Sequence, residues 1–368
     1  MASPKRAKKS GYAIGGSPKD REIVRLRDEN SRLSKEIKQQ HREKLAEDEV
    51  RRLLGVLGGK PTKPPSWPLR IKNKKDTPEV PSTIWSDWHG GEVVSKAEVN
   101  GLNEFNLTIM KARVRRLVER TLRLTDKHNG TYPGFVLNLL GDFVSGGLHA
   151  ELAKTDEIES IGAALAIRDL LVWAITEVAE RFGKVYIPCA AGNHGRNTLK
   201  PEFKRYVYKN FDWMIFKLLE AHFAGDKRIK FDIRPANEVF YRIYNKRFLA
   251  MHGDMLGVKG GDGIIGAIGP IMRGEVKVRG SSVLSGFDCL LMGHWHQPLW
   301  LPRVIVANSL KGYDEFAKNA LRAPPTIPSQ PLFFLHPRYG ITSRWEVYLE
   351  GNETDRQVEW VSVFGQAA

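Results

Sequence analysis

Five apolar runs, each followed by a loop that carries Asp, Asn or His, constrain this chain more than any other feature. They read STIWSDWHGG (82–91), LNLLGDFVS (137–145), VYIPCAAGNHGR (185–196), FLAMHGD (248–254) and CLLMGHWHQP (289–298). Each run is short, apolar and bounded by turn residues, which is typical of a buried strand. In an open α/β sheet, sites are assembled at the carboxyl ends of the strands. The order of the runs therefore predicts an α/β fold in which the loops meet at one site.

The first loop places Asp87 and His89 two residues apart directly after its apolar run. Side chains i and i+2 point to the same face of a strand, so a carboxylate and an imidazole here can bind one divalent cation. His294 and His296 repeat this spacing in the last loop.

The chain resembles the calcineurin-like metallophosphoesterase family, whose pattern is D-x-H, G-D, G-N-H, H and G-H-x-H. All five blocks are present, in order, over about residues 80–310. The resemblance implies a four-layer α/β/β/α sandwich and a metal-dependent phosphoric ester hydrolase. Within the family, the chain looks most similar to DNA-repair exonuclease-type enzymes and phage phosphoesterases.

The resemblance also implies two metal sites that share one carboxylate. It assigns one metal to Asp87, His89, Asp142 and His296, and the other to Asp142, Asn193, His252 and His294. Mixed oxygen and imidazole ligands suit Mn²⁺, Fe or Zn²⁺ better than Ca²⁺. We expect two divalent ions, Mn²⁺ first, with Zn, Fe or Mg as alternatives. A hydroxide bridging the metals would be the nucleophile of an in-line attack at phosphorus.

His194 is the remaining motif histidine, and the resemblance implies a catalytic role beside the leaving group. A histidine suits this role because its ordinary pKa lies near working pH. Two positions depart from the family pattern: Gly195 stands where Asp usually follows the histidine, and Ser145 replaces the second Asp of G-D-x-x-D. Either His194 and His89 lack their usual carboxylate partners, or other groups supply that support.

Substrate contacts are less constrained by the sequence. Arg196 is a candidate for a bidentate phosphate contact or a plain surface arginine. Asp254 either orients a ligating histidine or caps a turn. The glycine-rich segment 257–280 predicts a mobile loop with a short helix near 264–273. Its candidate phosphate contacts are Lys259, Arg273, Lys277 and Arg279.

Trp88 and Trp295 flank predicted metal ligands. They could stack on a nucleic-acid base or pack in the core.

The net charge of +15 predicts a polyanionic partner such as nucleic acid. The excess lies in residues 1–76, with 21 Lys and Arg against 10 Asp and Glu, a net +11. The remainder has 36 and 32, a net +4. The charge therefore favours a basic N-terminal arm rather than a basic catalytic domain.

The domain organisation follows from changes in composition along the chain. We expect a disordered basic tail (1–18), a helical arm (19–57), a Pro- and Lys-rich linker (58–82), a metallophosphoesterase domain (83–350) and a C-terminal tail (351–368). The arm carries a short 3-4 repeat with a polar Asn30 in its seam, which favours an oligomerisation helix or a charged surface helix.

The body alternates between helical and strand patterns. Helices are predicted over 96–127, 158–182 (apolar nearly all round, hence buried) and 203–223. Besides the strands before the motifs, short strands are predicted at 229–234, 239–244, 304–306, 332–335 and 345–349. Strand–helix alternation followed by a β-rich half favours two sheets face to face, flanked by helices.

The chain shows no apolar run of the ~20 residues that span a bilayer, and its N-terminus lacks the apolar core of a signal peptide. Cys189 and Cys289 lie in apolar runs and are expected to be buried, reduced thiols, which favours a cytoplasmic location.

The favoured function is a two-metal phosphodiesterase or nuclease acting on DNA or RNA. One alternative is a phosphomonoesterase for proteins or nucleotides, because its site chemistry is nearly the same. A second is a non-catalytic, metal-stabilised scaffold.

Overall fold

The computed structural model describes residues 78–128, 131–146, 152–198, 200–258, 266–282 and 286–351, and part of 22–34. The chain divides into two units, residues 1–63 and 64–368. In the first unit the described residues are helical, and Leu26 and Leu33 of the predicted seam are exposed. The basic tail, most of the arm, the linker up to residue 77 and residues 352–368 lie outside the described ranges.

The first sheet of the second unit has six strands in the order β11-β10-β1-β2-β3-β4. They are β1 (Val80–Trp85), β2 (Phe135–Leu139), β3 (Val185–Cys189), β4 (Ile229–Ile233), β10 (Ser329–His336) and β11 (Gly340–Tyr348). β1 to β4 are parallel, and β10 runs antiparallel to both β1 and β11. β1 begins inside the segment assigned to the linker, because Val80 already pairs with Leu335 of β10.

The second sheet has five strands in the order β5-β6-β7-β9-β8. They are β5 (Val239–Ile243), β6 (Lys246–Ala250), β7 (Cys289–Met292), β8 (Leu299–Trp300) and β9 (Val304–Val306). β6, β7 and β9 are parallel, whereas β5 and β8 are antiparallel edge strands. The two-residue β8 carries no repeating pattern, and the sequence did not predict it.

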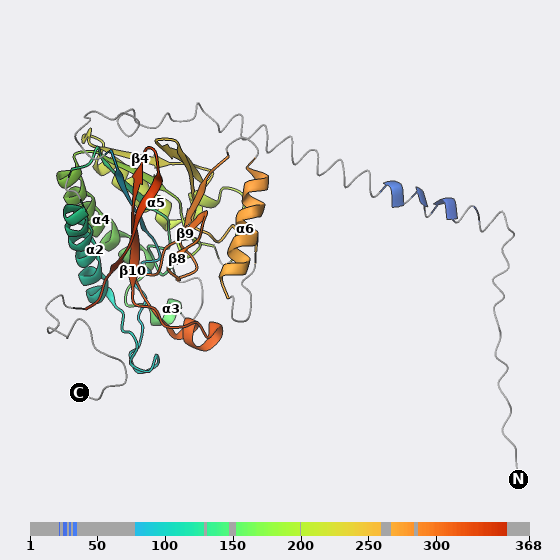
Figure 1. Ribbon diagram of the computed structural model, residues 1–368. Coiled ribbons are helices and arrows are strands. Elements are labelled where there is room, and N and C mark those ends of the chain that lie inside the picture. Colours follow the sequence, from blue (N-terminus) through green and yellow to red (C-terminus); the bar gives the residue numbers. More distant parts are fainter. Residues whose placement is uncertain are drawn as a thin grey trace, which may run out of the picture. The chain divides into compact units, whose positions relative to one another are not determined.

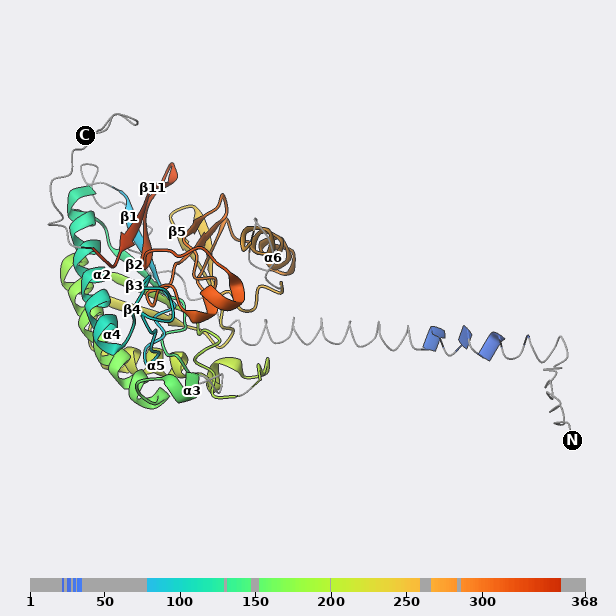
Figure 2. The same cartoon turned by 90° about the horizontal axis from the view of Figure 1, so that it is seen from below.

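The helices are α2 (Leu107–His128), α3 (Leu152–Thr155), α4 (Ser160–Phe182), α5 (Phe211–His222) and α6 (Ile268–Ser281). Two short helical turns, η1 (Tyr206–Lys209) and η2 (Ala317–Leu321), accompany them. Figures 1 and 2 show α2 and α4 on one side of this unit and α6 on the opposite side.

Three hydrophobic clusters explain this arrangement. The first joins α2, α4 and α5 to one face of the six-stranded sheet, through residues such as Leu137 and Ile187. The second combines alternate residues of both sheets, such as Val136 and Phe248. The third joins the five-stranded sheet to Ile271 and Val278 of α6. Strand residues alternate between clusters because successive side chains point to opposite faces. The predicted mixed α/β fold with two sheets and flanking helices is thus confirmed.

Two helix predictions were wrong at their starts. The helix predicted from residue 96 begins at Leu107, because the Asn106 side chain accepts a hydrogen bond from the Ile109 amide (2.9 Å) and caps it. The helix predicted from residue 203 likewise divides into η1 and α5, and Asn210 caps α5 by accepting from the Asp212 amide.

The prediction that the 158–182 helix is buried all round was also wrong. Ile161 and Leu165 of α4 are 63% and 45% exposed, and only one face packs against the first cluster.

The short helix predicted near 264–273 in the glycine-rich segment is present as α6, but it occupies Ile268–Ser281 and so extends further along the chain than expected. A Cβ at Gly274 would lie 2.2 Å from Cγ of Leu256, so this glycine permits close helix packing. Trp88 is fully buried in the core, and Trp295 packs against the third cluster. The structure thus favours core packing over base stacking for Trp88.

Both cysteines are free and buried, as expected. Within the described ranges, every helix is too short or too polar to cross a bilayer.

Arg113 of α2 offers a test of how the domain is held together. It is 1% exposed and donates to the Leu310 carbonyl (3.0 Å), to Oδ1 of Asn103 (2.7 Å) and to Glu350 (3.1 Å). Replacing Arg113 with Met should lower the free energy of unfolding by about 3 kcal/mol, because buried acceptors lose their donor. Urea denaturation at constant m-value measures this change. The matched change at exposed Arg115 should cost less than about 0.5 kcal/mol, and equal losses would contradict this role.

Candidate metal centre

The five predicted loops follow strands that lie side by side in the two sheets. β1, β2 and β3 are adjacent and parallel in the first sheet, and β6 and β7 are adjacent and parallel in the second. Their carboxyl ends therefore share an edge within each sheet. The ligand candidates that follow these ends are Asp87, His89, Asp142, Asn193, His252, His294 and His296.

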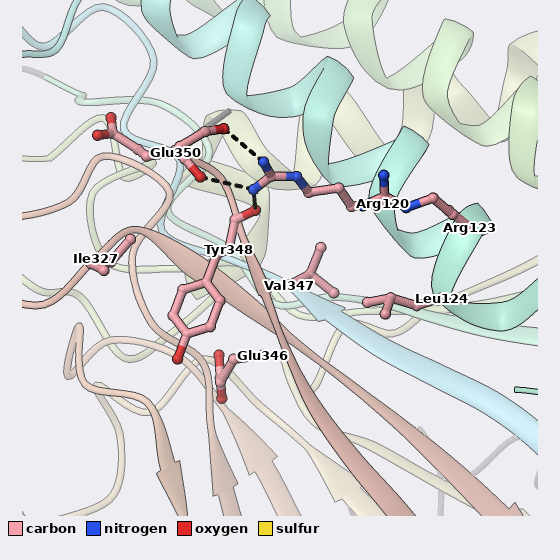
Figure 3. A pocket seen from close by; sticks show the side chains of 9 residues that line it. Arg120, Arg123, Leu124, Ile327, Glu346, Val347, Tyr348 and Glu350 are labelled. Atoms are coloured by element: carbon pink, nitrogen blue, oxygen red, sulfur yellow. Dashed lines mark hydrogen bonds between the residues drawn. The ribbon is translucent and has the colours of Figure 1, made fainter. Parts of the chain in front are cut away.

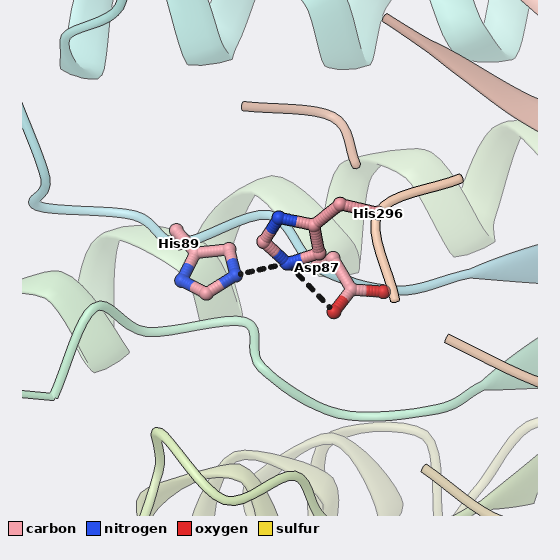
Figure 4. Close-up of side chains that lie close together, drawn as sticks. All are labelled: Asp87, His89 and His296. Carbon is pink, nitrogen blue, oxygen red and sulfur yellow. Dashed lines mark hydrogen bonds and ion pairs between the residues drawn. The ribbon is translucent and has the colours of Figure 1, made fainter. Parts of the chain in front are cut away.

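Asp87, His89 and His296 form the first group that could hold a metal ion. One ligand atom of each lies within 4.8 Å of the others. Figure 4 shows the two imidazoles and the carboxylate converging, with Nε2 of His296 3.1 Å from Nε2 of His89 and 3.3 Å from Oδ1 of Asp87. The group combines the first and last predicted loops.

Asp142, His252 and His294 form the second group, with the same limit of 4.8 Å. Nδ1 of His252 lies 2.6 Å from the Leu140 carbonyl, which can only accept, so Nδ1 carries the proton. Nε2 of His252 is left to face Oδ2 of Asp142 at 3.0 Å. This nitrogen is buried and has no hydrogen-bond partner among the described residues, as expected of a ligand atom awaiting a cation.

The two groups are joined through the backbone. The amide of His294 donates to both carboxylate oxygens of Asp87, at 3.0 and 3.1 Å. The amide of His194 donates to Oδ1 of Asp142 at 2.7 Å. Asp142 belongs to the second group. That its carboxylate binds both metal ions stays a prediction.

Asn193 follows β3, which lies next to β2 in the first sheet, and its side chain is suited to binding a metal ion. Its Oδ1 is buried without a hydrogen-bond partner within the described part of the chain. An amide oxygen in that state fits a hard divalent cation.

The ligands themselves adopt a backbone conformation that L-residues seldom use. Asp87, His89, Asp142, His294 and His296 have φ between 49° and 69°. Asp87 and His89 do lie in one candidate metal group, as expected, but strand geometry is not the reason, because both residues lie beyond β1 and have a left-handed backbone. Several left-handed residues close together require surrounding contacts that hold the backbone in this conformation. Such clusters are common at functional sites.

Glycines let the loops approach one another closely. A Cβ at Gly192 would lie 2.1 Å from Oδ1 of Asp142, and one at Gly293 would lie 2.2 Å from Oδ2 of Asp87. The glycines of the G-N-H and G-H-x-H blocks are thus required by contact with the carboxylates rather than by turn conformation.

Burial and neighbouring charges shift the pKa values of the candidate imidazoles in different directions. Burial opposes protonation of His252, but the charge of Asp142 outweighs it and raises the pKa of His252 well above its usual value. Burial lowers the pKa of His294 to about 3, and burial, aided by Lys311, lowers the pKa of His89 well below its usual value. Neutral imidazoles bind metals without competition from a proton. Asp87 and Asp142 are at most 1% exposed, and buried carboxylates require nearby positive charge. The residues present therefore fit divalent cations.

His194 finds support without the carboxylate of the family pattern. Its Nδ1 lies 2.9 Å from the Ser145 carbonyl, which accepts a hydrogen bond from Nδ1–H and so leaves Nε2 free for chemistry. The ring lies edge-on to His89, with centroids 4.5 Å apart.

Asp212 is a site residue that the sequence analysis missed. Its carboxylate accepts from the amides of Asp142 (2.8 Å), Phe143 (3.1 Å) and Gly192 (2.9 Å), and so joins two ligand loops. Burial, with the charge of Asp142, raises the pKa of Asp212 to about 6. The sequence could have indicated that Asn210 and Asp212 lie at the start of a helix, because Asn and Asp are common there. It does not show which loops the carboxylate of Asp212 faces.

The predicted substrate contacts remain predictions. Arg196 donates from Nε and Nη1 to the carbonyls of Thr198 and Asn193, so its own loop uses part of the guanidinium. Asp254 accepts from Oη of Tyr206 (2.9 Å). Arg273 is exposed on α6, and Lys259 lies outside the described residues. Lys277 and Arg279 bind the Gly257 carbonyl and Glu275.

A cavity of about 480 Å³ lies between α2 and β11, and none of the predicted site residues lines it. In Figure 3 the Arg120 guanidinium points at the carbonyls of Tyr348 and Glu350 and donates to them. The cavity thus belongs to the contact between α2 and β11 rather than to the metal centre.

No family model matches the chain, and no curated protein matches it. Among solved structures, the chain is similar to a candidate 5′-nucleotidase from Staphylococcus aureus in complex with alpha-ketoglutarate. The match has a TM-score of 0.34 and 10% sequence identity over 76% of this chain. The chain spans 56% of the length of that protein, and a likeness of this degree carries no argument about function.

The side chains of Asn210 and Asp212 fill the space beside Gly195, so a side chain at position 195 would collide with them. A Cβ at position 195 would lie 2.3 Å from Oδ1 of Asn210 and 3.0 Å from Oδ2 of Asp212. Gly195→Ala should therefore destabilise the protein by about 1–3 kcal/mol. At Gly162 of α4 the nearest atom would be 3.8 Å away, so Gly162→Ala should stabilise by about 0.4–1 kcal/mol. Thermal unfolding of both variants checks this, and a neutral Gly195→Ala would refute the crowding.

Proposed function

We propose that this protein is a calcineurin-like metallophosphoesterase that uses two divalent metal ions to hydrolyse phosphodiester bonds in DNA or RNA. One observation carries the proposal: loops from four parallel strands of two sheets bring six ligand side chains into two adjoining groups of three. The two sheets and their flanking helices are consistent with a four-layer α/β/β/α sandwich.

The residues define what the centre can do. Asp87, His89 and His296 would hold one ion, and Asp142, His252, His294 and Asn193 the other. Bound divalent ions would polarise phosphoryl oxygens and lower the pKa of water. The mixed donor set suits Mn²⁺, with Zn²⁺, Fe and Mg²⁺ as alternatives.

His194 is proposed as the general acid or stabiliser of the leaving group. Its Nδ1–H is fixed on the Ser145 carbonyl, so only Nε2 can exchange a proton with a leaving oxygen. Its ring contacts His89 of the first group, which places it beside the reacting centre.

The nucleic-acid substrate is proposed from charge. The net +11 of residues 1–76 supplies a polycationic arm for a phosphate backbone. The helical part of that arm could also join copies of the chain.

A substrate panel with Mn²⁺ tests the reaction class. We expect hydrolysis of bis-p-nitrophenyl phosphate, measured by absorbance. We also expect hydrolysis of single- or double-stranded DNA or RNA, measured on gels. Asp142→Ala should abolish both Mn²⁺ binding in the second group and turnover. Turnover of p-nitrophenyl phosphate alone would make the protein a phosphomonoesterase, and metal binding without any turnover would make it a scaffold.

His194→Ala should leave Mn²⁺ binding intact and lower the kcat for diesters by about 10²–10⁴-fold, because a proton donor is lost. Isothermal titration with Mn²⁺ and steady-state kinetics measure the two effects. His222→Ala, at an exposed position at the end of α5, is the matched control and should leave kcat unchanged. An unchanged kcat in His194→Ala would remove its catalytic role.

Deleting residues 1–76 should weaken polynucleotide binding and flatten its dependence on salt, because the arm's cations no longer release counterions. Hydrolysis of bis-p-nitrophenyl phosphate should be spared. Fluorescence anisotropy with labelled DNA at several salt concentrations measures the slope. A parallel loss of small-diester hydrolysis would show that the segment does not act as an electrostatic tether.

A further inference from the structure

Two buried polar atoms without hydrogen-bond partners among the described residues face each other beside the first ligand group. They are Nδ1 of His89 and Oε2 of Glu92, and they lie 3.5 Å apart. His89 is 1% exposed and Glu92 6% exposed. Since Nε2 of His89 points at His296 and Asp87, Nδ1 is the nitrogen left for a supporting partner.

Glu92 is itself held in place by a buried lysine. Nζ of Lys311 lies 2.7 Å from Oε1 of Glu92 and also pairs with Asp314. Lys311 and Asp314 are 3% and 5% exposed. The lysine engages one oxygen of Glu92 and leaves the other directed at His89. A buried charge fixed by a second charge has little freedom to move.

We propose that Glu92 is the positioning residue of His89 and that Lys311 fixes it. This inference rests on the proposed function, because it concerns the metal held by Asp87, His89 and His296. A carboxylate on the far nitrogen of a ligating imidazole orients the ring and raises its basicity. Glu92 would thereby strengthen the binding of this one metal and not of its neighbour.

Ser145 does not compete for this role. Its hydroxyl donates to Oδ1 of Asp156 at 2.8 Å, and its carbonyl accepts from His194. The position at which the family pattern has a carboxylate is therefore engaged elsewhere, and Glu92 supplies the group from the turn that follows His89.

Isothermal titration of the full-length protein with Mn²⁺ tests the inference without any turnover. In Glu92→Gln, one of two Mn²⁺ ions should bind about 10–100-fold more weakly, and the other within about threefold of wild type. Glu275→Gln is the matched control, because Glu275 of α6 is a fully buried glutamate that pairs with Arg279 of the same helix and with Arg303 before β9. It should leave both affinities unchanged.

Glu92→Asp provides a second variant should the glutamine variant fail to fold. It keeps a negative charge beside Lys311 but withdraws the carboxylate from Nδ1 of His89 by one methylene. Its affinity for the same single metal should fall between those of wild type and Glu92→Gln. A purely structural role for Glu92 would lower the unfolding temperature without weakening one metal selectively.

The outcomes separate this inference from the proposed function. Two Mn²⁺ ions bound with equal strength by wild type and both Glu92 variants would overturn the inference and leave the function standing. Selective weakening in a protein that hydrolyses no phosphodiester would support the inference and overturn the function. Wild-type protein that binds no Mn²⁺ would overturn both.

Discussion

The site depends on the hydrogen bonds between the carboxylate of Asp87 and the backbone amide of His294. Asp87 follows a strand of the first sheet, yet both its carboxylate oxygens accept the amide of His294, which follows a strand of the second sheet. The imidazole of His252, which also follows a strand of the second sheet, adds a second link by donating to the Leu140 carbonyl, which follows a strand of the first sheet. Two sheets that share only an apolar cluster could slide or tilt, whereas these directional bonds fix the register of their strand ends. The candidate metal ligands are therefore part of what aligns the sheets.

This alignment is maintained against local strain. Five ligand residues occupy the left-handed region, at a cost of about 1–3 kcal/mol each. The surrounding loops must compensate, and Asp212 contributes by accepting three amides from two of them. Glycines such as Gly192 allow an approach that any side chain would prevent. A scaffold without metals would gain nothing from such strained, closely packed carboxylates, so the geometry favours a site that binds cations.

Much of this could be predicted from the sequence, because the ligands lie in short blocks directly after apolar runs. What could not be predicted depends on contacts between distant segments. Asp212 lies 70 residues from Asp142, and nothing local shows that its carboxylate faces the ligand loops. The extent of α6 was underestimated because its glycines suggest a loop, whereas Gly274 is required by packing against Leu256. The support for His194 likewise could not be predicted, because it comes from the backbone carbonyl of Ser145 rather than from a side chain.

A crystal structure of the protein grown or soaked with Mn²⁺, with anomalous differences measured at the manganese edge, tests the central claim most directly. We expect two anomalous peaks, one bound by Asp87, His89 and His296 and the other by Asp142, His252 and His294. Manganese bound only elsewhere, or absent from both groups at saturating concentration, would contradict it.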